Sequence, residues 1–502
     1  MIFRYDRPTS LSLDFKPKLT VTVIVPARNN QAKLDLVLAA LSRQSYPSSL
    51  TKVVVIDDGS ETKLTLPKIK PTNCTLIRFE NRPGQWGKVD AVNAIAEKVK
   101  TDVIWCLDSD MVTHPDHLAH HMKWHHAGSE YIVLGSKRFV ENWPYDSNQL
   151  SAALLSGKFD SLHHESFPHD YVEARIKATN ELRNPKLEGF RTFVGATFSM
   201  PTSSWQELDG YHQGFTTGED TEFGWRATMH GFALVPEHHA KAWHLGRTTF
   251  QENSDLMFAH NNPKLLNWIP RLRTTTRNTE LGHIMWAVPD QGVVIDCRGT
   301  SLEQFQRLIR PFIEDEAESE FTLLGPWSAL DSRYSPIDDQ YRELRYIRSW
   351  YQDDPRFVFV EAPENPSIEW ILSLIPVDGT PFHFYFDGPI DSEIDRSALR
   401  EVLLKRELGL LGAIDSRGYR AFILFTPALG RAWRNSPHSL YDGILQGWGF
   451  RWATWSAIKD DRGTIFRRSV LFIRYAINRF RQVRSFPELA NLIKRGIKLL
   501  FR

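Results

Sequence analysis

Two aspartates separated by one serine carry the strongest chemical signal in this chain. Asp108-Ser109-Asp110 directly follows the apolar, strand-like run at residues 103–107. Two carboxylates this close repel each other strongly unless a positive charge lies between them. A divalent cation that also binds phosphate oxygens would supply that charge. An isolated pair of this kind is usually a solvated turn, so the interpretation depends on the residues that accompany it.

Polar residues also follow two strand-like runs upstream of this pair. The β-branched run at 21–25 ends in Pro26-Ala27-Arg28, and the apolar run at 53–56 ends in Asp57-Asp58. A helix-period segment separates the two runs, and such a unit places its strand ends at one sheet edge, where open α/β sheets bind ligands. The P-loop pattern and the G-x-G-x-x-G fingerprint are both absent, so the sequence supports neither an ordinary ATPase nor a dinucleotide enzyme.

Two later segments add cations and further acids to this pattern. The loop with Arg82, Gly84, Gly87 and Lys88 precedes a helix-period segment. Glycines and cations before a helix start could cradle a diphosphate. Residues 218–220, Gly-Glu-Asp, begin another amphipathic segment, and these acids could also be no more than favourable charge at a helix N-terminus.

In this order the motifs resemble those of the family 2 glycosyltransferases with a GT-A fold. The matching segments are 23–26, 57–60, 87–93, 108–110 and 218–226, and the resemblance covers residues 19–250. It implies an inverting, metal-dependent glycosyltransferase with a Rossmann-like domain that binds a nucleotide sugar.

The resemblance also implies roles for individual residues. Asp220, with Glu219 beside it, would remove the proton from the acceptor hydroxyl as a general base. Asp110 and His244 would bind Mn²⁺ or Mg²⁺, which neutralises charge on the departing diphosphate. The implied substrate-binding residues are Pro26, Ala27, Arg28, Asp57, Asp58, Arg82, Lys88, Asp108, Ser109 and Trp225.

Further details refine the resemblance. Asp58 would accept a hydrogen bond from the nucleotide base, which favours a UDP-sugar donor, and Asp108 would hold the donor sugar or its ribose. The loop at 82–88 departs from the commoner Gly-x-x-x-Ala-Arg-Asn form. The Gln-x-x-Arg-Trp motif of processive members is missing, which argues against a polymerase similar to cellulose synthase.

The chain after residue 280 repeats part of the first pattern. Strand-like runs alternate with helix-period segments, and the run at 382–386 ends in Asp387-Gly388-Pro389, where the first part has its two aspartates. We therefore predict an α/β chain with a catalytic GT-A domain over 1–280. A second α/β domain over 281–460 would be a degenerate, non-catalytic GT-A repeat or an unrelated domain, and a tail would follow over 461–502.

The tail is strongly basic. From Arg462 to Arg502 it has eleven basic residues and one acid, and apolar residues recur every three or four positions from Phe466 to Phe480. Basic amphipathic helices bind anionic membrane surfaces. We expect a peripheral protein on the inner, cytoplasmic membrane face, although the tail could instead pack on its own domain. Nucleic-acid binding is not expected, because the remainder of the chain is acidic.

Composition fits a large enzyme of the cytoplasm. The chain has 502 residues, of which 42% are hydrophobic, and its three cysteines suggest no disulfide framework. No stretch approaches the roughly 18 apolar residues of a membrane span. His117, His121 and His125 share one helix face at a spacing of four, which predicts an exposed polar face rather than a metal site.

Two functional classes stay open from the sequence. The first is a glycosyltransferase that acts on a glycan or glycolipid acceptor. The alternative is a non-catalytic nucleotide-sugar-binding or scaffold protein of a glycan assembly complex. The donor sugar, the linkage and the oligomeric state have no signal in the sequence.

Overall fold

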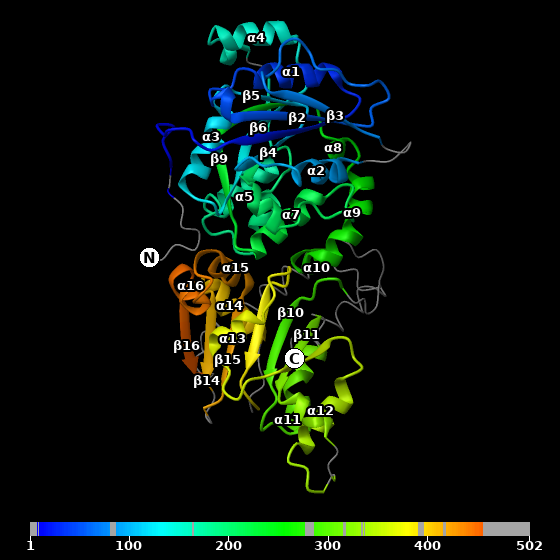
Figure 1. The fold of residues 1–502 in the computed structure, drawn as a ribbon, viewed down its shortest axis with the longest axis vertical. Coiled ribbons are helices and arrows are strands. Elements are labelled where there is room, and N and C mark those ends of the chain that lie inside the picture. The colour runs from blue at the N-terminus through cyan, green and yellow to red at the C-terminus, as the bar shows by residue number, and fades with distance from the viewer. Residues whose placement is uncertain are drawn as a thin grey trace, which may run out of the picture.

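A computed structural model describes most of the chain before residue 455. The described residues are 8, 10–80, 87–162, 165–276, 286–314, 318–332, 335, 337–389, 396–414 and 418–454. Two sheets, each flanked by helices, follow one another along the long axis of the molecule (Figure 1). The predicted tail and the predicted boundary at residue 280 lie outside the described residues.

The first sheet has a parallel half and a mixed half. Its strand order is β3-β2-β1-β4-β8-β6-β9-β5, and β7 pairs with β6. The strands are β1 Val21–Ala27, β2 Thr51–Asp58, β3 Cys74–Phe79, β4 Val103–Leu107, β5 Met111–Thr113, β6 Tyr131–Val140, β7 Phe167–Pro168, β8 Thr197–Pro201 and β9 Ala233–Leu245. β1 pairs in parallel with β2 and β4, so these three strands end at the same sheet edge.

Helices cover both faces of this sheet. The helices of this part of the chain are α1 Gln31–Leu41, α2 Lys88–Ala96, α3 His117–Ala127, α4 Ser147–Leu155, α5 Asp170–Ala178, α6 Thr202–Glu207, α7 Glu219–Met229, α8 Thr249–Glu252, α9 Ser254–Trp268 and α10 Pro270–Thr276. Residues of α9 and α10 pack towards the second sheet. Short 3₁₀ turns lie at Ser48–Leu50, Phe159–Leu162 and Gly189–Thr192. The central strands are buried on both faces because helices cover them, as their continuous apolar sequences predicted.

The histidine face of α3 differs from the prediction. His117 and His121 are fully buried against β8, and His125 is almost so. The hydroxyl groups of Thr197 and Ser199 lie within 2.7–2.9 Å of the three imidazoles. The expectation of an exposed face was wrong because β8 supplies hydrogen-bond partners that allow these rings to be buried.

The second sheet has the order β12-β11-β10-β13-β15-β14-β16. Its strands are β10 Gln291–Asp296, β11 Ser319–Gly325, β12 Phe357–Glu361, β13 Phe382–Phe386, β14 Leu410–Ile414, β15 Arg420–Phe425 and β16 Phe450–Thr454. Its helices are α11 Leu302–Glu314, α12 Arg342–Tyr351, α13 Ile368–Ser373, α14 Arg396–Lys405, α15 Thr426–Asn435 and α16 Leu440–Gly447, with a 3₁₀ turn at Trp327–Asp331.

This order repeats that of the first sheet. With β10 in the place of β1, the strands β11, β12, β13, β14, β15 and β16 take the places of β2, β3, β4, β6, β8 and β9. The directions agree as well. β13 and β14 are antiparallel to β15, as β4 and β6 are to β8, and β14 is parallel to β16, as β6 is to β9. A repeat of the first domain requires this topology.

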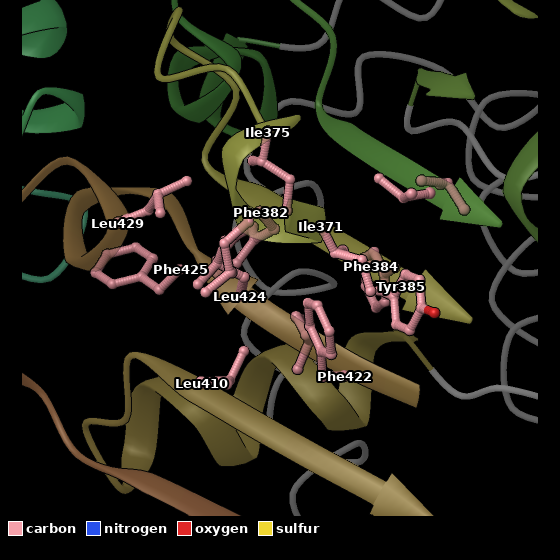
Figure 2. Packing of buried hydrophobic residues seen from close by; sticks show 14 of the residues in the cluster. Ile371, Ile375, Phe382, Phe384, Tyr385, Leu410, Phe422, Leu424, Phe425 and Leu429 are labelled. Atoms are coloured by element: carbon pink, nitrogen blue, oxygen red, sulfur yellow. The ribbon is translucent and has the colours of Figure 1, made fainter. Parts of the chain in front are cut away.

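The second sheet has an aromatic core, and the same buried cluster continues into the first part of the chain. Phe384 on β13 and Phe422 and Phe425 on β15 are buried, and Ile371 from α13 packs over the same strands (Figure 2). The predicted fold class, a GT-A-type α/β domain followed by a second α/β domain, is therefore confirmed for the described residues.

The two sheets contact each other through α7 and α15. Trp225 on α7 donates a hydrogen bond from its indole nitrogen to the carbonyl oxygen of Gly379, at 3.0 Å. A Cβ atom added to Gly231 would lie 2.1 Å from the backbone nitrogen of Arg431. The backbones therefore touch where no side chain fits. Among the described helices, none has the length and apolarity needed to cross a membrane.

Candidate active site

Acidic and basic side chains meet at the sheet edge where β1, β2 and β4 end. The acids Asp108 and Asp110 follow β4, and Glu219 and Asp220 begin α7. β5 pairs Met111 with His244 on β9, which brings that histidine beside Asp110. Lysines from three other elements complete the group: Lys33 on α1, Lys88 on α2 and Lys137 on β6.

Asp110 and His244 face each other at this edge. The Nε2 atom of His244 lies 3.5 Å from Oδ1 of Asp110, and its Nδ1 atom lies 3.0 Å from the carbonyl oxygen of Gly246. A carbonyl oxygen only accepts, so Nδ1 carries the proton. Burial lowers the pKa of His244 despite the opposing charge of Asp110, which favours the neutral ring. Its Nε2 lone pair then points at a carboxylate.

A cation held between these two electron-pair donors would relieve their repulsion. A carboxylate and an imidazole are ligands that suit Mn²⁺ or Mg²⁺. Within the described residues, no group of three or more histidine, cysteine or acidic side chains is arranged to hold a metal. A Mg²⁺ ion is typically bound by one or two carboxylates together with substrate phosphates. Asp110 and His244 therefore fit the protein's share of such a site.

Lys88 joins the acid pair after β4 to the acids of α7. Its Nζ atom lies 3.3 Å from Oδ1 of Asp108 and 3.4 Å from Oε1 of Glu219. Burial alone would lower the pKa of Lys88, but Asp108, Glu219 and Asp220 outweigh burial and raise it. Lys88 is thus a permanent cation at the first position of α2.

The two acids of α7 have different surroundings. Glu219 is buried, and burial raises its pKa although Lys88 opposes the change. Asp220 is half-buried and accepts backbone hydrogen bonds from Thr221 at 2.7 Å and Gly195 at 3.4 Å. Of the two, Asp220 is therefore the acid that an incoming molecule can reach.

The residues predicted to bind the nucleotide lie at the ends of β1 and β2. Pro26 and Ala27 end β1, and Arg28 follows. Asp58 is buried and accepts a hydrogen bond from the backbone nitrogen of Gly87 at 3.3 Å, which links β2 to the start of α2.

Asp57 holds its own loop. Its carboxylate accepts hydrogen bonds from the backbone nitrogens of Ser60 at 2.9 Å and Leu64 at 3.2 Å, and from Arg78 at 2.7 Å. Burial raises the pKa of Asp57, but these hydrogen bonds outweigh burial and lower it below the usual range. Both oxygens are engaged within the chain.

One predicted site residue lies elsewhere. Trp225, expected to bind substrate, is 1% exposed and packs against Phe190 in the contact between the two sheets. The structure does not bring Trp225 together with the other predicted site residues, because this part of α7 faces the second sheet rather than the strand ends. Ser109 lies between the two aspartates, half-buried, and Arg82 is outside the described residues.

Two lysines of the site, Lys33 and Lys137, were not predicted from the sequence. The Nζ atom of Lys33 lies 3.5 Å from Oδ2 of Asp110 and donates to the carbonyl oxygen of Leu245 at 2.6 Å. Lys33 lies in the first turn of α1, a few residues after the end of β1. Its position in the sequence could therefore have indicated that it lies near the site. Lys137 had no such signal, because its place depends on how β6 pairs with β9.

Comparison with known proteins gives one family and several distant relatives. The family model described as "Glycosyltransferase like family 2" matches residues 17–261. The galactofuranosyltransferase GlfT2 of Mycolicibacterium smegmatis is 20% identical over 353 residues, which are 67% of this chain and 51% of that protein. The uncharacterized glycosyltransferase YfnE of Bacillus subtilis is 26% identical over 170 residues, 33% of this chain and 37% of that protein.

Solved structures give weaker matches. The mannosyltransferase PcManGT of Pyrobaculum calidifontis, in complex with GDP-Man and Mn²⁺, is 16% identical, with a TM-score of 0.31 over 47% of this chain and 60% of that chain. Staphylococcus aureus TarS 1–349 with UDP is 17% identical, with a TM-score of 0.32 over 48% of this chain and 63% of that chain.

The matched region of this chain agrees with the motif order found in its sequence. The chain spans about half, or less, of the length of the curated relatives that it matches. The family match begins just before β1 and ends within α9, so it contains every element of the sheet edge described above. Residues 17–261 are therefore similar to the family 2 glycosyltransferases, the family that the motifs indicated.

Proposed function

We propose that this chain is an inverting, metal-dependent glycosyltransferase. It moves a sugar from a nucleoside diphosphate, with UDP as the favoured nucleotide, to a hydroxyl group of a glycan or lipid-linked acceptor. The similarity to the family 2 glycosyltransferases supports glycosyl transfer. The observation that carries the proposal is the Asp110–His244 pair, 3.5 Å apart, at the same edge as the acids of α7.

The donor half of the site would work by binding and charge. Asp110 and His244 would hold Mn²⁺ or Mg²⁺, which as a Lewis acid neutralises charge on the departing diphosphate. Lys88 adds a fixed positive charge beside Asp108. Asp58 would accept a hydrogen bond from the base of the nucleotide, which is the reason for favouring uracil.

The acceptor half depends on one carboxylate. Asp220 would take the proton from the acceptor hydroxyl, an effect worth roughly 10²–10⁴-fold in rate. Direct attack by that hydroxyl is a single displacement, so the anomeric carbon would be inverted. The Oε1 atom of Glu219 lies 3.4 Å from the Nζ atom of Lys88. Glu219 would therefore position Lys88 beside the reacting groups.

The location is a further part of the proposal. The basic, periodically apolar sequence after residue 461 supports binding to anionic lipid on the cytoplasmic membrane face. Removing residues 464–502 should release the protein from anionic vesicles in a sedimentation assay. Equal pelleting of the full and shortened chains would instead favour a tail that packs on its own domain.

A binding screen with a catalytic readout tests the proposal. Nucleotide sugars are added with and without Mn²⁺, and a specific donor should raise the melting temperature by mass action only when Mn²⁺ is present. The hit is then incubated with the protein, and NMR of the anomeric proton follows hydrolysis or transfer. Binding without any turnover would favour the non-catalytic nucleotide-sugar-binding protein, and no binding by any donor would refute both functions.

A further inference from the structure

Lys137 differs from the other two lysines of the site in having no partner. Lys33 and Lys88 lie within 3.5 Å of the acids Asp110 and Asp108. Within the part of the chain that the structure describes, the Nζ atom of Lys137 has no hydrogen-bond or ion-pair partner. It lies 5.5 Å from the centroid of the Phe139 ring, and the residue is only 8% exposed.

A buried ammonium group without a partner is unfavourable. Burial lowers the pKa of Lys137, and the carboxylates of Asp108, Asp110 and Asp220 oppose this change from a distance. Contact with an aromatic ring compensates only part of the lost hydration. An anion bound beside Lys137 would replace that hydration with a charge-assisted hydrogen bond.

A cavity opens in front of this lysine. It has a volume of about 580 Å³ and lies between β6, α5, the bend of β9 and the segment before β8. Cavities of roughly 300–1,000 Å³ are typical of small-molecule sites. Val194 and Ala196 line it and flank Gly195, whose backbone nitrogen donates to Asp220. The cavity therefore adjoins the proposed general base.

The acids in the cavity wall do not cancel the charge of Lys137. Glu237 accepts from Lys123 at 2.9 Å, and Glu181 pairs with His238 at 2.6 Å. The other two acids of the wall, Asp170 and Glu173, are exposed on the first turn of α5, where water screens them. Lys137 thus presents to the cavity a positive charge that no acid of the described cavity wall pairs with.

From these observations we infer that the cavity binds an anionic group of the acceptor, a phosphate or a carboxylate, against Lys137. This inference rests on the proposed function, because it takes the molecule beside Asp220 to be the acceptor. A hydroxyl presented to Asp220 and an anion held by Lys137 would belong to the same molecule. Lys137 would then select charged acceptors over neutral ones.

The test compares three sugars that differ in charge: glucose, glucuronate and glucose 6-phosphate. Ligand-observed NMR titrations use the full chain with saturating UDP and Mg²⁺, so that the diphosphate site is filled. The wild type should bind at least one of the two anionic sugars about tenfold or more tightly than glucose. The better of the two identifies the anion as carboxylate or phosphate.

Three variants assign the preference to Lys137. Lys137→Met should abolish it and Lys137→Arg should retain it. Lys177→Met, which removes an exposed lysine from the same cavity wall, should leave it unchanged. Equal binding of all three sugars by the wild type, or an unchanged preference in Lys137→Met, would overturn the inference.

The experiment also separates this inference from the proposed function. Calorimetry on the same samples measures UDP binding with Mg²⁺, which Lys137→Met should leave near the wild-type value. Failure of UDP to bind the wild type would count against the glycosyltransferase proposal alone. The sugar titrations, repeated without nucleotide, would still decide whether Lys137 holds an anion.

Discussion

The strands β4 and β13 occupy the same position in the two sheets, but the acids that follow them have different partners. After β4, Asp108 faces Lys88 at 3.3 Å and Asp110 faces His244 at 3.5 Å. After β13, both oxygens of Asp387 accept hydrogen bonds from Arg420, one from its backbone nitrogen and one from Nε. Arg420 belongs to β15, the strand directly beside β13.

At the corresponding edge of the second sheet, arginines of the same chain neutralise the acids. Asp296, at the end of β10, is paired in the same way with Arg298 at 2.5 Å. A Cβ atom at Gly388, in the place of Ser109, would lie 2.5 Å from the ring of Tyr419. In both pairs one arginine, through its backbone nitrogen and its guanidinium group, donates to both oxygens of the carboxylate, which disfavours metal binding. The same topology therefore supports chemistry only where the acids stay available.

The comparison predicts its largest effect at the acid and the histidine that face each other after β4, with the acid after β13 as the control. Asp110→Ala should abolish Mn²⁺-dependent UDP binding, and His244→Ala should weaken it. Loss of an outer-shell partner alone typically costs roughly 10–100-fold in metal affinity, so loss of a ligand should reach at least the upper end. Titration calorimetry measures both, with Asp387→Ala as the matched control that should bind as the wild type does. Unchanged affinity in Asp110→Ala would show that this residue is not the ligand.

The second prediction concerns the base on α7. Asp220→Asn keeps the shape of the side chain and removes the proton acceptor, so kcat should fall by roughly 10²-fold or more. The affinity for the nucleotide sugar should stay near that of the wild type. Initial-rate kinetics with a transferable acceptor measure the two constants separately. If Glu219→Gln loses turnover and Asp220→Asn keeps it, the roles of the two acids must be exchanged.

The third prediction uses two helices in equivalent chain positions. α3 buries His117, His121 and His125 against β8, whereas α14 buries leucine and valine side chains. Burial lowers the pKa of His117 and of His125 to about 3, and lowers that of His121 well below its usual value. The folded state therefore holds these rings neutral, while the unfolded chain takes up protons below about pH 6.5.

The sign of this pH effect follows from proton uptake. The three neutral rings do not reduce the free energy of unfolding above about pH 6.5. As the pH falls from there towards 3, the free energy of unfolding decreases by at most ~1.4 kcal/mol per pH unit for each ring. Hydrogen exchange at pH 7 and 5, corrected for intrinsic rates, should show a greater loss of protection in β4 and β8 than in β13 and β15. Burial also lowers the pKa of His383 on β13, to about 4, so a smaller loss is expected there. Equal losses in both sheets would mean that the three histidines of α3 do not dominate the acid sensitivity.

The smallest effect is expected where the sheets touch. A Cβ atom at Gly430 would lie 2.3 Å from the backbone oxygen of Met229, so Gly430→Ala should shift the backbone and destabilise by about 1–3 kcal/mol. Urea denaturation measures the change. Gly447→Ala is the control, because a Cβ atom there meets nothing within 4 Å. A neutral Gly430→Ala would show that the contact is looser than the distances indicate.

Sequence reasoning went furthest where signals are local. The strands β1, β2 and β4 could be predicted because their apolar runs end abruptly in polar residues. Asp58, Lys88, Asp110 and Asp220 could be located because they lie at strand ends or helix starts; their roles stay predictions. The repeated sheet was visible as a repeated order of runs, although its strand pairing was not.

What was missed depends on distant pairing. The histidine face of α3 reads as polar, and its hydrogen-bond partners lie 74–80 residues away on β8. Trp225 is in the matching motif, but its burial is decided by Gly379, 154 residues later. Lys137 enters the site only because β6 lies between β8 and β9. Such long-range neighbours leave no periodicity in the chain.

The backbone contact between the two sheets also restricts how this protein can evolve. At Gly231 and Gly430 an added Cβ atom would lie within 2.3 Å of the opposite backbone, so larger residues at either position need a compensating shift across the contact. A second domain taken from another gene would dock on α7 only if it carried a glycine at the matching position. The two halves are therefore expected to be inherited together, and lineages that lose one glycine should also have remodelled the other.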